Sequence, residues 1–414
     1  MPSGLILLEG GPLTVQTALA LCAGVSAFSL MAINLFLATR PVLIEAALGG
    51  LDRVYLTHKW TGIAALAAAV LHQSLDMTFE GDIVTVDLAK LAVDAAETVF
   101  PLLVALVLVS WIKRLPPRVT APLASIPLLA RWSNRDLLPY ALWRWSHRAL
   151  GILFLVFCYH QFFVIVPFKA TAQVSAYLNV MAALGVVSFL YTQFGAPLRP
   201  RRYKVTRVEH LPAATVIEAK PLGRPLKPRP GAFAVISVAR AGLREPHPFT
   251  ISGTLPDGGL QFSIRALGDY TTRLRDTVAV GDRMTIEGGY GRFDHRRGGP
   301  QQIWLAGGIG ITPFLSFVDA LEPSDQRQIH LVYCVTSAEQ VVGLDRLEAA
   351  AARVPGFTFE IHASRTAGRF DAARLIEAAP FPLREASFHF CGPAPMRDGM
   401  IKGLRDAGQS PKSL

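Results

Sequence analysis

The sequence predicts a multi-domain membrane protein: an α-helical transmembrane bundle of about five to six spans, then an antiparallel β-barrel domain, then an α/β domain with a parallel sheet. Three observations lead to this fold class. The first half of the chain contains five long apolar segments, short alternating strands rich in Gly and Pro follow Arg202, and strands alternate with helices from residue 301 onward. We therefore expect three domains, at residues 1–199, 200–299 and 300–414.

The five apolar segments are near or above the ~20 residues that a helix needs to cross the hydrocarbon core of a bilayer. No charged side chain occurs within residues 13–39, 60–75, 98–112, 149–168 or 170–198. The two shorter segments reach the length of a span by including charged residues at their ends. Each of the five segments is therefore expected to form a transmembrane helix.

Lysine and arginine gather on one side of the expected spans. Residues 113–135 carry five of them and residues 199–204 carry four, whereas residues 76–90 carry four acidic side chains and a single lysine. Because positively charged loops stay on the cytoplasmic side, we expect a multi-pass protein of the cell membrane. Its N-terminus would lie outside and its C-terminal half in the cytoplasm.

Four histidines lie in two of these segments or directly before them, His58 and His72 in one expected helix and His147 and His160 in another. The spacings of fourteen and thirteen residues separate the two imidazoles of each helix by roughly 20 Å. Ionisable side chains at bilayer depth usually face a partner inside the bundle, so two such helices side by side offer two stacked bis-imidazole sites, as two b-type haems require. His58 would pair with His147 near the cytoplasmic face, and His72 with His160 near the outer face. A role in helix packing alone is the alternative.

The second of these helices needs an adjustment to present both rings inward. Fourteen positions return to within about 40° of the same helix face, but thirteen miss it by about 140°. A curve, a π-bulge or local tightening would correct this. Lys59, Arg144 and Arg148 lie beside the inner pair, where they either meet haem propionates or extend to the membrane interface.

The chain carries a formal net charge of +10 and four scattered cysteines. Much of the positive excess follows from membrane topology, and no basic stripe interleaved with aromatic residues is present, so we expect no nucleic-acid partner. The cysteines form no CxxC motif and no cluster. This argues against a disulfide framework, a zinc site or a fused iron–sulfur domain.

Short alternating segments after Arg202 predict the antiparallel barrel: YKVTRVEHL, ATVIEAKPL, GAFAVISVA, GLQFSIRAL and RMTIEGGY. From residue 301, IWLAGGIGITPFLSFVDAL predicts a strand, a glycine loop and a helix. The strands IHLVYCV, FTFEIHA and ASFHFCG follow, with a helix near 338–353. This alternation predicts a parallel sheet with right-handed crossovers.

The glycine loop contains Gly307, Gly308 and Gly310. Glycines after a strand let the backbone approach a pyrophosphate at the N-terminus of the following helix. Pro313 stands where the dinucleotide fingerprint has its third glycine, and glycines also serve tight turns. By itself the loop therefore leaves both a nucleotide site and a simple turn open.

Five motifs in order resemble those of one class of flavin-dependent dehydrogenases. They are His247-Pro248-Phe249-Thr250; Ile264-Arg265-Ala266-Leu267-Gly268 with Thr271 and Thr272; Gly288-Gly289-Tyr290-Gly291; Gly307 to Pro313; and Cys391-Gly392-Pro393. The set is similar to that of ferredoxin-NADP reductase-type dehydrogenases. Preceded by the paired histidines, the whole chain resembles the ferric reductase and NADPH oxidase superfamily.

The resemblance implies which residues bind FAD. Phe249 would lie against the isoalloxazine ring, and Thr250, as a catalytic residue, would hydrogen-bond the flavin edge near its reactive nitrogen. The pyrophosphate would be met by His247, Gly268, Thr271 and Thr272, with Pro248, Ile264 and Arg265 in the same binding set. Without the resemblance, HPFT is a strand entry stiffened by proline.

The resemblance also implies a site for the nicotinamide dinucleotide. It would be bound by Gly307, Gly308, Gly310, Thr312 and Pro313, and by Cys391, Gly392 and Pro393. Cys391 would be the second catalytic residue, beside the nicotinamide ring, although buried cysteines more often serve as small apolar side chains. Thr336, Ser337 and Arg365, near the ends of successive strands, slightly favour NADPH over NADH because they offer a site for a 2′-phosphate.

The implied function is that of a transmembrane oxidoreductase. Cytoplasmic NAD(P)H would give a hydride to FAD, and electrons would pass singly through two b-type haems to a small acceptor outside, ferric iron or oxygen. A quinone or a periplasmic redox partner fits the same path. A haem-free, membrane-anchored NAD(P)H:flavin reductase and a proton-conducting bundle with histidine relays are further alternatives, and the oligomeric state is left open.

Three departures from the superfamily pattern bear on this function. The sequence stops at Leu414 without the aromatic residue that covers the flavin in related dehydrogenases, so either the flavin face is more open or the chain is truncated. Residues 13–39 contain no basic residue of the kind that animal-type oxidases of this superfamily place beside the outer haem, and Asp76 lies four residues after His72, which argues against superoxide production. The expected outer loops are short, which argues against a receptor domain for a bulky iron chelate.

Overall fold

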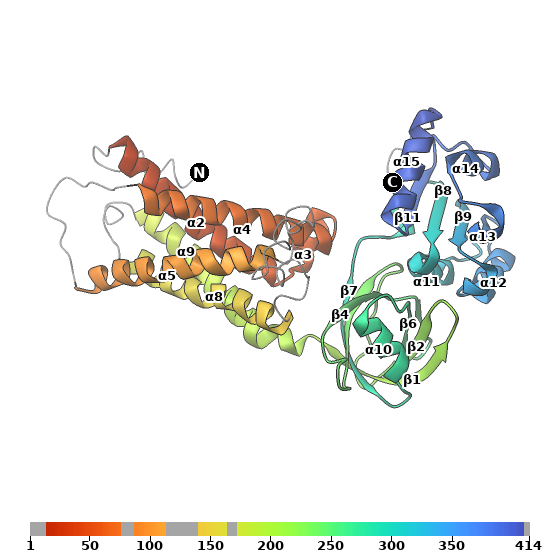
Figure 1. Cartoon of the computed structure of the whole chain (residues 1–414), viewed down its shortest axis with the longest axis horizontal. Helices are drawn as coiled ribbons and strands as arrows, with labels where there is room; N and C mark the ends of the chain where they lie inside the picture. The colour runs from red at the N-terminus through yellow and green to blue at the C-terminus, as the bar shows by residue number, and fades with distance from the viewer. Residues whose placement is uncertain (1–13, 76–86, 113–139, 164–171, 410–414) are drawn as a thin grey trace, which may run out of the picture. The chain divides into compact units, whose positions relative to one another are not determined.

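The computed structural model describes residues 14–75, 87–112, 140–163 and 172–409 of the chain. The chain divides into two compact units, Met1–Leu198 and Arg199–Leu414. The first unit is helical and the second combines two sheets with helices (Figure 1).

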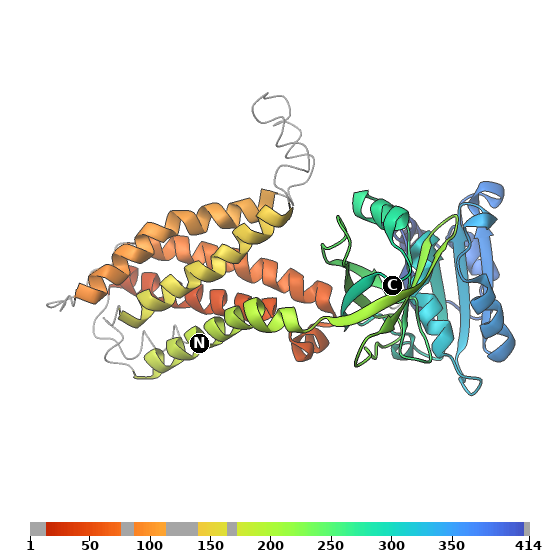
Figure 2. The same cartoon turned by 90° about the horizontal axis from the view of Figure 1, so that it is seen from below.

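Long helices make up the first unit (Figure 2). They are α2 (Val15–Ala38), the short α3 (Val42–Leu48), α4 (Leu51–Ser74), α5 (Asp87–Ile112), α8 (Tyr140–Phe163) and α9 (Ala172–Leu190). After α9 the chain continues through a π-helical turn, η3 (Tyr191–Gly195), and a short 3-10 turn, η4 (Ala196–Leu198). Helix α2 packs along α4 and α9, and α5 packs along α8.

Four of the described helical segments are long and apolar enough to cross a membrane: Val15–Ala38, Leu51–Ser74, Lys90–Ser110 and Ala172–Gly195. Helix α8 is also 24 residues long but is not among them. Two arginines and two histidines interrupt its apolar sequence. The described residues thus contain four candidate spans, fewer than the five to six that the sequence predicts.

Apolar side chains lie both inside and outside this helical unit. The core holds Phe28 of α2 stacked on Phe154 of α8, with ring centres 5.1 Å apart. Outside, large apolar side chains are about 60% exposed, among them Trp60, Trp145, Phe162 and Val180. Exposed apolar surface of this extent is typical of helices that face lipid.

The second unit begins with a curled antiparallel sheet, which we call the antiparallel lobe (residues 201–290). Its strands are β1 (Arg201–His210), β2 (Thr215–Pro221), β3 (Phe233–Val238), β4 (His247–Thr250), β5 (Gly253–Thr254), β6 (Leu260–Ile264) and β7 (Arg283–Tyr290), with α10 (Asp269–Thr277) after β6. The strand order is β4-β3-β7-β1-β2-β6-β5, and every pair is antiparallel. Strands β4 and β5 lie at the two ends of the sheet, and closure into a barrel stays a prediction.

A four-stranded parallel sheet follows, in what we call the parallel lobe (residues 301–406). Its strands are β8 (Gln301–Gly307), β9 (Gln328–Val335), β10 (Phe357–Ala363) and β11 (Ser387–Cys391), in the order β10-β9-β8-β11. Its helices are η6 (Gly308–Ile311), α11 (Thr312–Ala320), η7 (Ala338–Gln340), α12 (Leu344–Arg353), α13 (Ser364–Ala367), α14 (Ala372–Ala378) and α15 (Ala394–Asp406), and η5 (His295–Arg297) precedes the lobe. The helix expected near 338–353 is interrupted at Gly343, whose φ of 74° is incompatible with a right-handed helix.

Both faces of the parallel sheet are covered, which explains its nearly continuous apolar strands. On β8, Trp304 and Ala306 belong to the core formed with α11 and α12. Ile303 and Leu305, which alternate with them, belong to the core formed with α14 and α15. The sheet therefore holds the glycine loop, at the end of β8, on a buried and rigid support.

Candidate functional site

The structure brings the four histidines of the first unit together in two pairs. His58 on α4 lies beside His147 on α8, with ring centres 6.0 Å apart and ring planes inclined by 60°. His72 on α4 lies beside His160 on α8, with ring centres 6.5 Å apart and planes inclined by 75°. Each helix therefore contributes one imidazole to each pair.

In three of these imidazole rings, a hydrogen bond shows which nitrogen carries the proton and which keeps a lone pair for a metal. In each of the three, Nδ1–H donates to a backbone carbonyl oxygen of a neighbouring helix: His58 to Asn34 (3.1 Å), His72 to Ala20 (2.8 Å) and His160 to Ala92 (3.3 Å). Because a carbonyl oxygen only accepts, Nδ1 carries the proton and Nε2 keeps its lone pair. Metal-binding histidines commonly donate their second ring nitrogen in this way.

The ring separations suit two imidazoles on opposite sides of one metal ion. Metal–imidazole bonds of ~2.0–2.1 Å, with about 1 Å more from nitrogen to ring centre, put two such rings roughly 6–6.5 Å apart. The observed separations are 6.0 and 6.5 Å. Among the described residues no group of three His, Cys, Asp or Glu side chains forms a bare metal site. Two imidazoles fit the axial positions of a haem iron, whose other four ligands belong to the macrocycle.

Helix α8 reaches both pairs without the π-bulge or tighter turn considered from the thirteen-residue spacing. It is α-helical from Tyr140 to Phe163. Of the three adjustments considered for this helix, only a gradual curve is compatible with its hydrogen-bond pattern.

Neighbouring side chains shape the surroundings of the two pairs. A Cβ atom at Gly24 would lie 2.8 Å from Nδ1 of His72, so glycine leaves room for this imidazole beside α2. Trp143 stacks on His147, with ring centres 5.5 Å apart and planes inclined by 8°. One turn of helix before His147, the Nε atom of Arg144 is buried with no hydrogen-bond partner among the described residues. Buried guanidinium groups normally have an acceptor, so an anion fits this position.

In the second unit, the HPFT motif forms β4, and two of its rings gather around Tyr270. The ring centre of Phe249 lies 6.3 Å from that of Tyr270, and the ring centre of His247 lies 3.7 Å from it. Burial raises the pKa of Tyr270 to about 12. Burial also lowers the pKa of His247, against the opposing charges of Glu245 and Asp269. His247 is therefore a neutral imidazole at pH 7, suited to hydrogen-bond a pyrophosphate and not to neutralise it.

The other residues of this motif set occupy strand ends. Thr250 ends β4 opposite Phe233 of β3, and the exposed Pro248 lies two residues before it. Ile264 ends β6 with its side chain only 3% exposed, inside the core of the antiparallel lobe. Any contact of Ile264 with a cofactor would therefore be made by its backbone.

The start of α10 is held by Thr271. Its Oγ1 accepts from the backbone N–H groups of Leu267 (2.9 Å) and Gly268 (3.0 Å) and donates to the carbonyl oxygen of Gly268 (3.1 Å). A Cβ atom at Gly268 would meet no atom within 4 Å, so the space beside this turn is open. The Thr271 hydroxyl thus shapes the loop, whereas Thr272 in the next position is partly exposed and lies at the helix N-terminus.

In the parallel lobe, glycines bring the ends of β8 and β11 into close contact. A Cβ atom at Gly310 would collide with the carbonyl oxygen of Cys391. A Cβ atom at Gly307 would lie 2.7 Å from Cδ of Pro393 and 3.3 Å from Cα of Gly392. The Cys391-Gly392-Pro393 segment therefore lies directly against the glycine loop. Burial raises the pKa of Cys391, so its thiol stays protonated and suits packing against a ring better than nucleophilic attack.

The loop itself turns at Gly308, whose φ is 55°. The hydroxyl of Thr312 donates to the carbonyl oxygen of Ile309 (3.1 Å), and Pro313 occupies the first turn of α11. A Cβ atom at Gly308 would lie 3.5 Å from Nη1 of Arg265, which follows β6. The guanidinium of Arg265 therefore links the predicted FAD side of the site to the predicted nucleotide loop.

The residues considered for a 2′-phosphate also lie near one another. The backbone N–H of Arg365 donates to the carbonyl oxygen of Thr336 (3.0 Å). A hydrogen bond from the Ser337 side chain lowers the pKa of Glu339, and the charge of Arg365 acts in the same direction. A carboxylate here would compete with a 2′-phosphate for Arg365, so the slight preference for NADPH loses support.

Sequence reasoning missed several residues around these sites. Asn34 was detectable, because it is a polar side chain within the uncharged segment 13–39. Trp143 was detectable as an aromatic residue one turn from His147. The groups that accept from the imidazoles of His72 and His160 are the backbone carbonyls of Ala20 and Ala92. Backbone carbonyls occur at every residue, so the sequence gives no sign of them.

Two segments of the chain match known protein families. Residues 23–158 match the ferric reductase like transmembrane component, and residues 304–402 match the oxidoreductase NAD-binding domain. The toluate 1,2-dioxygenase electron transfer component of Pseudomonas putida is 29% identical over 192 residues, which are 45% of this chain and 56% of that protein. NADH–cytochrome b5 reductase 1 of Arabidopsis thaliana is 27% identical over 146 residues, 33% of this chain and 52% of that protein. The chain thus spans about half the length of these curated relatives.

Two of the solved structures that are similar to this chain are a flavohemoglobin and a ferredoxin NADP+ reductase. The flavohemoglobin of Malassezia yamatoensis is 16% identical, with a TM-score of 0.48 over 98% of this chain and 95% of that one. The ferredoxin NADP+ reductase of Neisseria gonorrhoeae is 19% identical, with a TM-score of 0.43 over 51% of this chain and 92% of that one.

The apolar helices and the first family match make this a membrane protein, and the second match makes it an oxidoreductase whose reductase domain supports binding of FAD and NAD(P)H. The chain therefore joins a ferric reductase-like transmembrane domain to a NAD-binding reductase domain of the ferredoxin-NADP reductase type.

Proposed function

We propose that this protein carries electrons across the cell membrane, from cytoplasmic NAD(P)H through FAD and two bis-histidine haems to a small acceptor outside. The observation that carries the proposal is the pairing of His58 with His147 and of His72 with His160, at ring separations of 6.0 and 6.5 Å. The Nδ1–H bonds to backbone carbonyls support it further, because they orient Nε2 as the ligand atom.

In the transmembrane domain (proposed residues 1–199), His58 and His147 would hold the inner haem and His72 and His160 the outer one. The buried Nε of Arg144 would meet a propionate of the inner haem. When bound, haem would supply an iron that accepts and releases single electrons, and two histidine ligands for each haem would favour outer-sphere transfer over direct binding of oxygen.

In the FAD domain (proposed residues 200–299), Phe249 would pack against the flavin ring and Thr250 would hydrogen-bond the flavin edge. Thr271 would hold the loop around Gly268 open for the pyrophosphate, and Thr272 and the neutral His247 would donate hydrogen bonds to it. When bound, FAD supplies the junction between a two-electron donor and one-electron carriers.

In the NAD(P)-binding domain (proposed residues 300–414), the Gly307–Pro313 loop would approach the dinucleotide with its backbone. The short side chains there permit this approach, and the N-terminus of α11 offers partial positive charge to phosphate. Cys391, with a protonated thiol, would pack beside the nicotinamide ring. Arg265, close to Gly308, would add charge at the meeting point of the two cofactors.

The distribution of lysine and arginine supports the cytoplasmic placement of the reductase domain. The family match to ferric reductase like transmembrane components favours ferric iron as the acceptor, with oxygen as the second candidate. The sequence also favours iron, because Asp76, four residues after His72 and outside the described residues, is acidic where a basic residue would assist oxygen.

The test is electron transfer across a closed membrane. The full chain, loaded with FAD and haem, is placed in vesicles that contain trapped ferricyanide, and NADPH or NADH is added outside. We expect reduction of the trapped oxidant, loss of this reduction in the His72→Ala variant, and retention of flavin reduction in the same variant. Equal reduction of trapped ferricyanide by wild type and His72→Ala would contradict the proposed path. Flavin reduction without haem would support the anchored reductase instead.

A further inference from the structure

One guanidinium group joins the two lobes of the second unit. Arg346, on α12, donates from Nε (3.1 Å) and Nη2 (2.5 Å) to the carboxylate of Asp319 and from Nη2 to the carbonyl oxygen of Leu315 (3.0 Å), both on α11. It also donates from Nη1 to Oε1 of Gln261 (2.8 Å) and from Nη2 to the carbonyl oxygen of Ser252 (2.6 Å). Its side chain is 19% exposed. We call this set the Arg346 clamp.

The clamp crosses from the parallel lobe to the antiparallel lobe. Ser252 follows β4 by two residues and Gln261 lies on β6, so both acceptors belong to the part of the antiparallel lobe that carries the proposed FAD residues. A Cβ atom at Gly253 would lie 3.1 Å from Nη2 of Arg346. The chain is therefore closely fitted to the guanidinium on its antiparallel side.

The helix held by the clamp is the one that follows the glycine loop. Helix α11 begins at Thr312, directly after η6 (Gly308–Ile311). Any shift of α11 relative to β4 and β6 therefore moves the nucleotide loop relative to Phe249 and Thr250. Hydride transfer is sensitive to such shifts, since a misplacement of about 1 Å reduces rates by up to ~100-fold.

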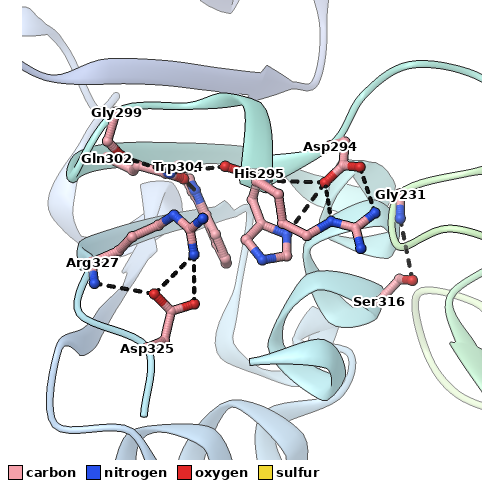
Figure 3. A network of polar contacts seen from close by, with 10 residues as sticks. Gly231, Asp294, His295, Gly299, Gln302, Trp304, Ser316, Asp325 and Arg327 are labelled. Carbon is pink, nitrogen blue, oxygen red and sulfur yellow. Dashed lines mark hydrogen bonds and ion pairs between the residues drawn. The ribbon is translucent and has the colours of Figure 1, made fainter. Parts of the chain in front are cut away.

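A second contact joins α11 to the antiparallel lobe. The backbone N–H of Gly231, before β3, donates to Oγ of Ser316 (3.3 Å), as Figure 3 shows. The φ of Gly231 is 80°, and a Cβ atom there would collide with the carbonyl oxygen of Phe293 and with the ring of Phe317. Helix α11 is thus bound to the antiparallel lobe both through Arg346 and through Ser316.

We propose that Arg346 is a positioning residue for hydride transfer, which holds α11 and its glycine loop at a fixed separation from the strands that carry the flavin. The proposal rests on the proposed function, because it assumes that FAD and NAD(P)H meet between these lobes. Arginine is suited to the task because its planar group reaches several acceptors at once, which lysine does not. Arg346 touches neither cofactor in this account and acts through α11.

The chain offers a matched control in Arg353, on the same helix. Nη2 of Arg353 donates to the carbonyl oxygens of Val318 (2.9 Å) and Leu321 (3.1 Å), at the end of α11 and just after it. Both acceptors lie in the parallel lobe. Arg353→Gln therefore removes contacts to the α11 region without removing any contact between the lobes.

The experiment measures flavin reduction by NADH or NADPH in the full chain, loaded with FAD and haem, by anaerobic stopped-flow absorbance. For Arg346→Gln we expect the limiting rate to fall about tenfold or more, with the dissociation constant of the nicotinamide cofactor changed less than about threefold. Arg353→Gln is expected to stay within about twofold of wild type, and Arg346→Lys to recover part of the rate.

A further variant isolates the contact between the lobes. Gln261→Leu leaves the Arg346–Asp319 pair intact and is expected to lower the limiting rate by a smaller factor without loss of bound FAD. It also serves if Arg346→Gln does not fold. Equal limiting rates in Arg346→Gln and Arg353→Gln, an unchanged rate in Gln261→Leu, or an effect confined to the dissociation constant would overturn the proposal. A wild-type flavin that neither nicotinamide reduces would overturn the proposed function itself.

Discussion

At the residue scale, a hydrogen bond from one imidazole nitrogen of a histidine determines whether the other nitrogen has a lone pair for binding a metal. His58, His72 and His160 each donate Nδ1–H to a backbone carbonyl, and Nε2 would therefore be the atom that binds a haem iron in the proposed site. The same bonds anchor α4 to α2 and α8 to α5. These histidines could therefore both pack the helices and bind haem. Substituting one of them and counting the bound haems distinguishes packing alone from haem binding.

Substitution of one histidine is expected to remove one haem. Replacing His72 by alanine leaves His160 as a single imidazole donor, so the outer haem is lost while the inner pair keeps its own. A pyridine haemochrome assay on the purified full chain should fall from two haems per chain to one. His210→Ala, at an exposed position on β1, is the control and should keep both. Two haems in His72→Ala would show that these histidines only pack the bundle.

A second residue-scale prediction concerns His295, which is 2% exposed and lies against Trp304 and Phe317. Burial lowers the pKa of His295 from 6.5 to about 4. Protonation therefore favours the unfolded state: the stability that this group contributes is complete above pH 6.5 and is lost as the pH falls toward 4. The loss at pH 4 amounts to ~3 kcal/mol.

Unfolding of the full chain, followed by tryptophan fluorescence between pH 7 and pH 4, measures this loss. The His295→Gln variant should lose less stability over that range than the wild type. Burial also lowers the pKa values of His330 and His389, but these groups titrate in both proteins and cancel in the difference. The same pH dependence in both proteins would contradict the assignment.

At the scale of elements, the account depends on the close approach of β8 and β11. The strands themselves were predictable, because each is a short apolar run bounded by turn residues. Their contact at Gly310 and Cys391 depends on register, which no local pattern encodes. The interruption of the expected helix at Gly343 has a local cause instead, since glycine takes a positive φ there where any other residue would be strained.

Substitution of Gly310 tests this junction. Gly310→Ala places a methyl group against the carbonyl oxygen of Cys391, so the glycine loop and β11 must separate. We expect weaker NAD(P)H binding by at least about tenfold, with FAD content unchanged. Gly399→Ala, in α15, meets no atom within 4 Å and should stabilise the protein by roughly 0.5–1 kcal/mol. Titration with NADH or NADPH measures the binding of each variant, and the melting temperature measures its stability. Unchanged NAD(P)H binding in Gly310→Ala would show that the glycine loop does not bind the nicotinamide cofactor.

The sequence predicted the histidine pairs and the motif residues but not the Arg346 clamp. The histidine spacings and the five motifs identified residues that come together, in two pairs on α4 and α8 and around the ends of β4, β6 and β8. The Arg346 clamp was not predictable, because its acceptors lie 27 to 94 residues away and include two backbone carbonyls. Acceptors of this kind carry no sequence signal.

At the scale of the whole molecule, the proposed path needs two redox groups on one pair of helices. The fourteen residues from His58 to His72 cover roughly 20 Å along α4, most of the ~30 Å hydrocarbon core. Two haems at these positions would divide electron transfer across the membrane into shorter steps. A single haem, or none, would leave the reductase domain without a path to the other face.

An anaerobic difference spectrum of the full chain shows whether two haems accept electrons from the nicotinamide cofactor. The FAD-supplemented protein is reduced with NADPH or NADH, separately with dithionite, and each spectrum is compared with that of the oxidised protein. We expect two b-type haems per chain, both reduced by the nicotinamide cofactor as fully as by dithionite. A haem-free protein that still oxidises NAD(P)H would contradict the account and identify the first unit as an anchor for a flavin reductase.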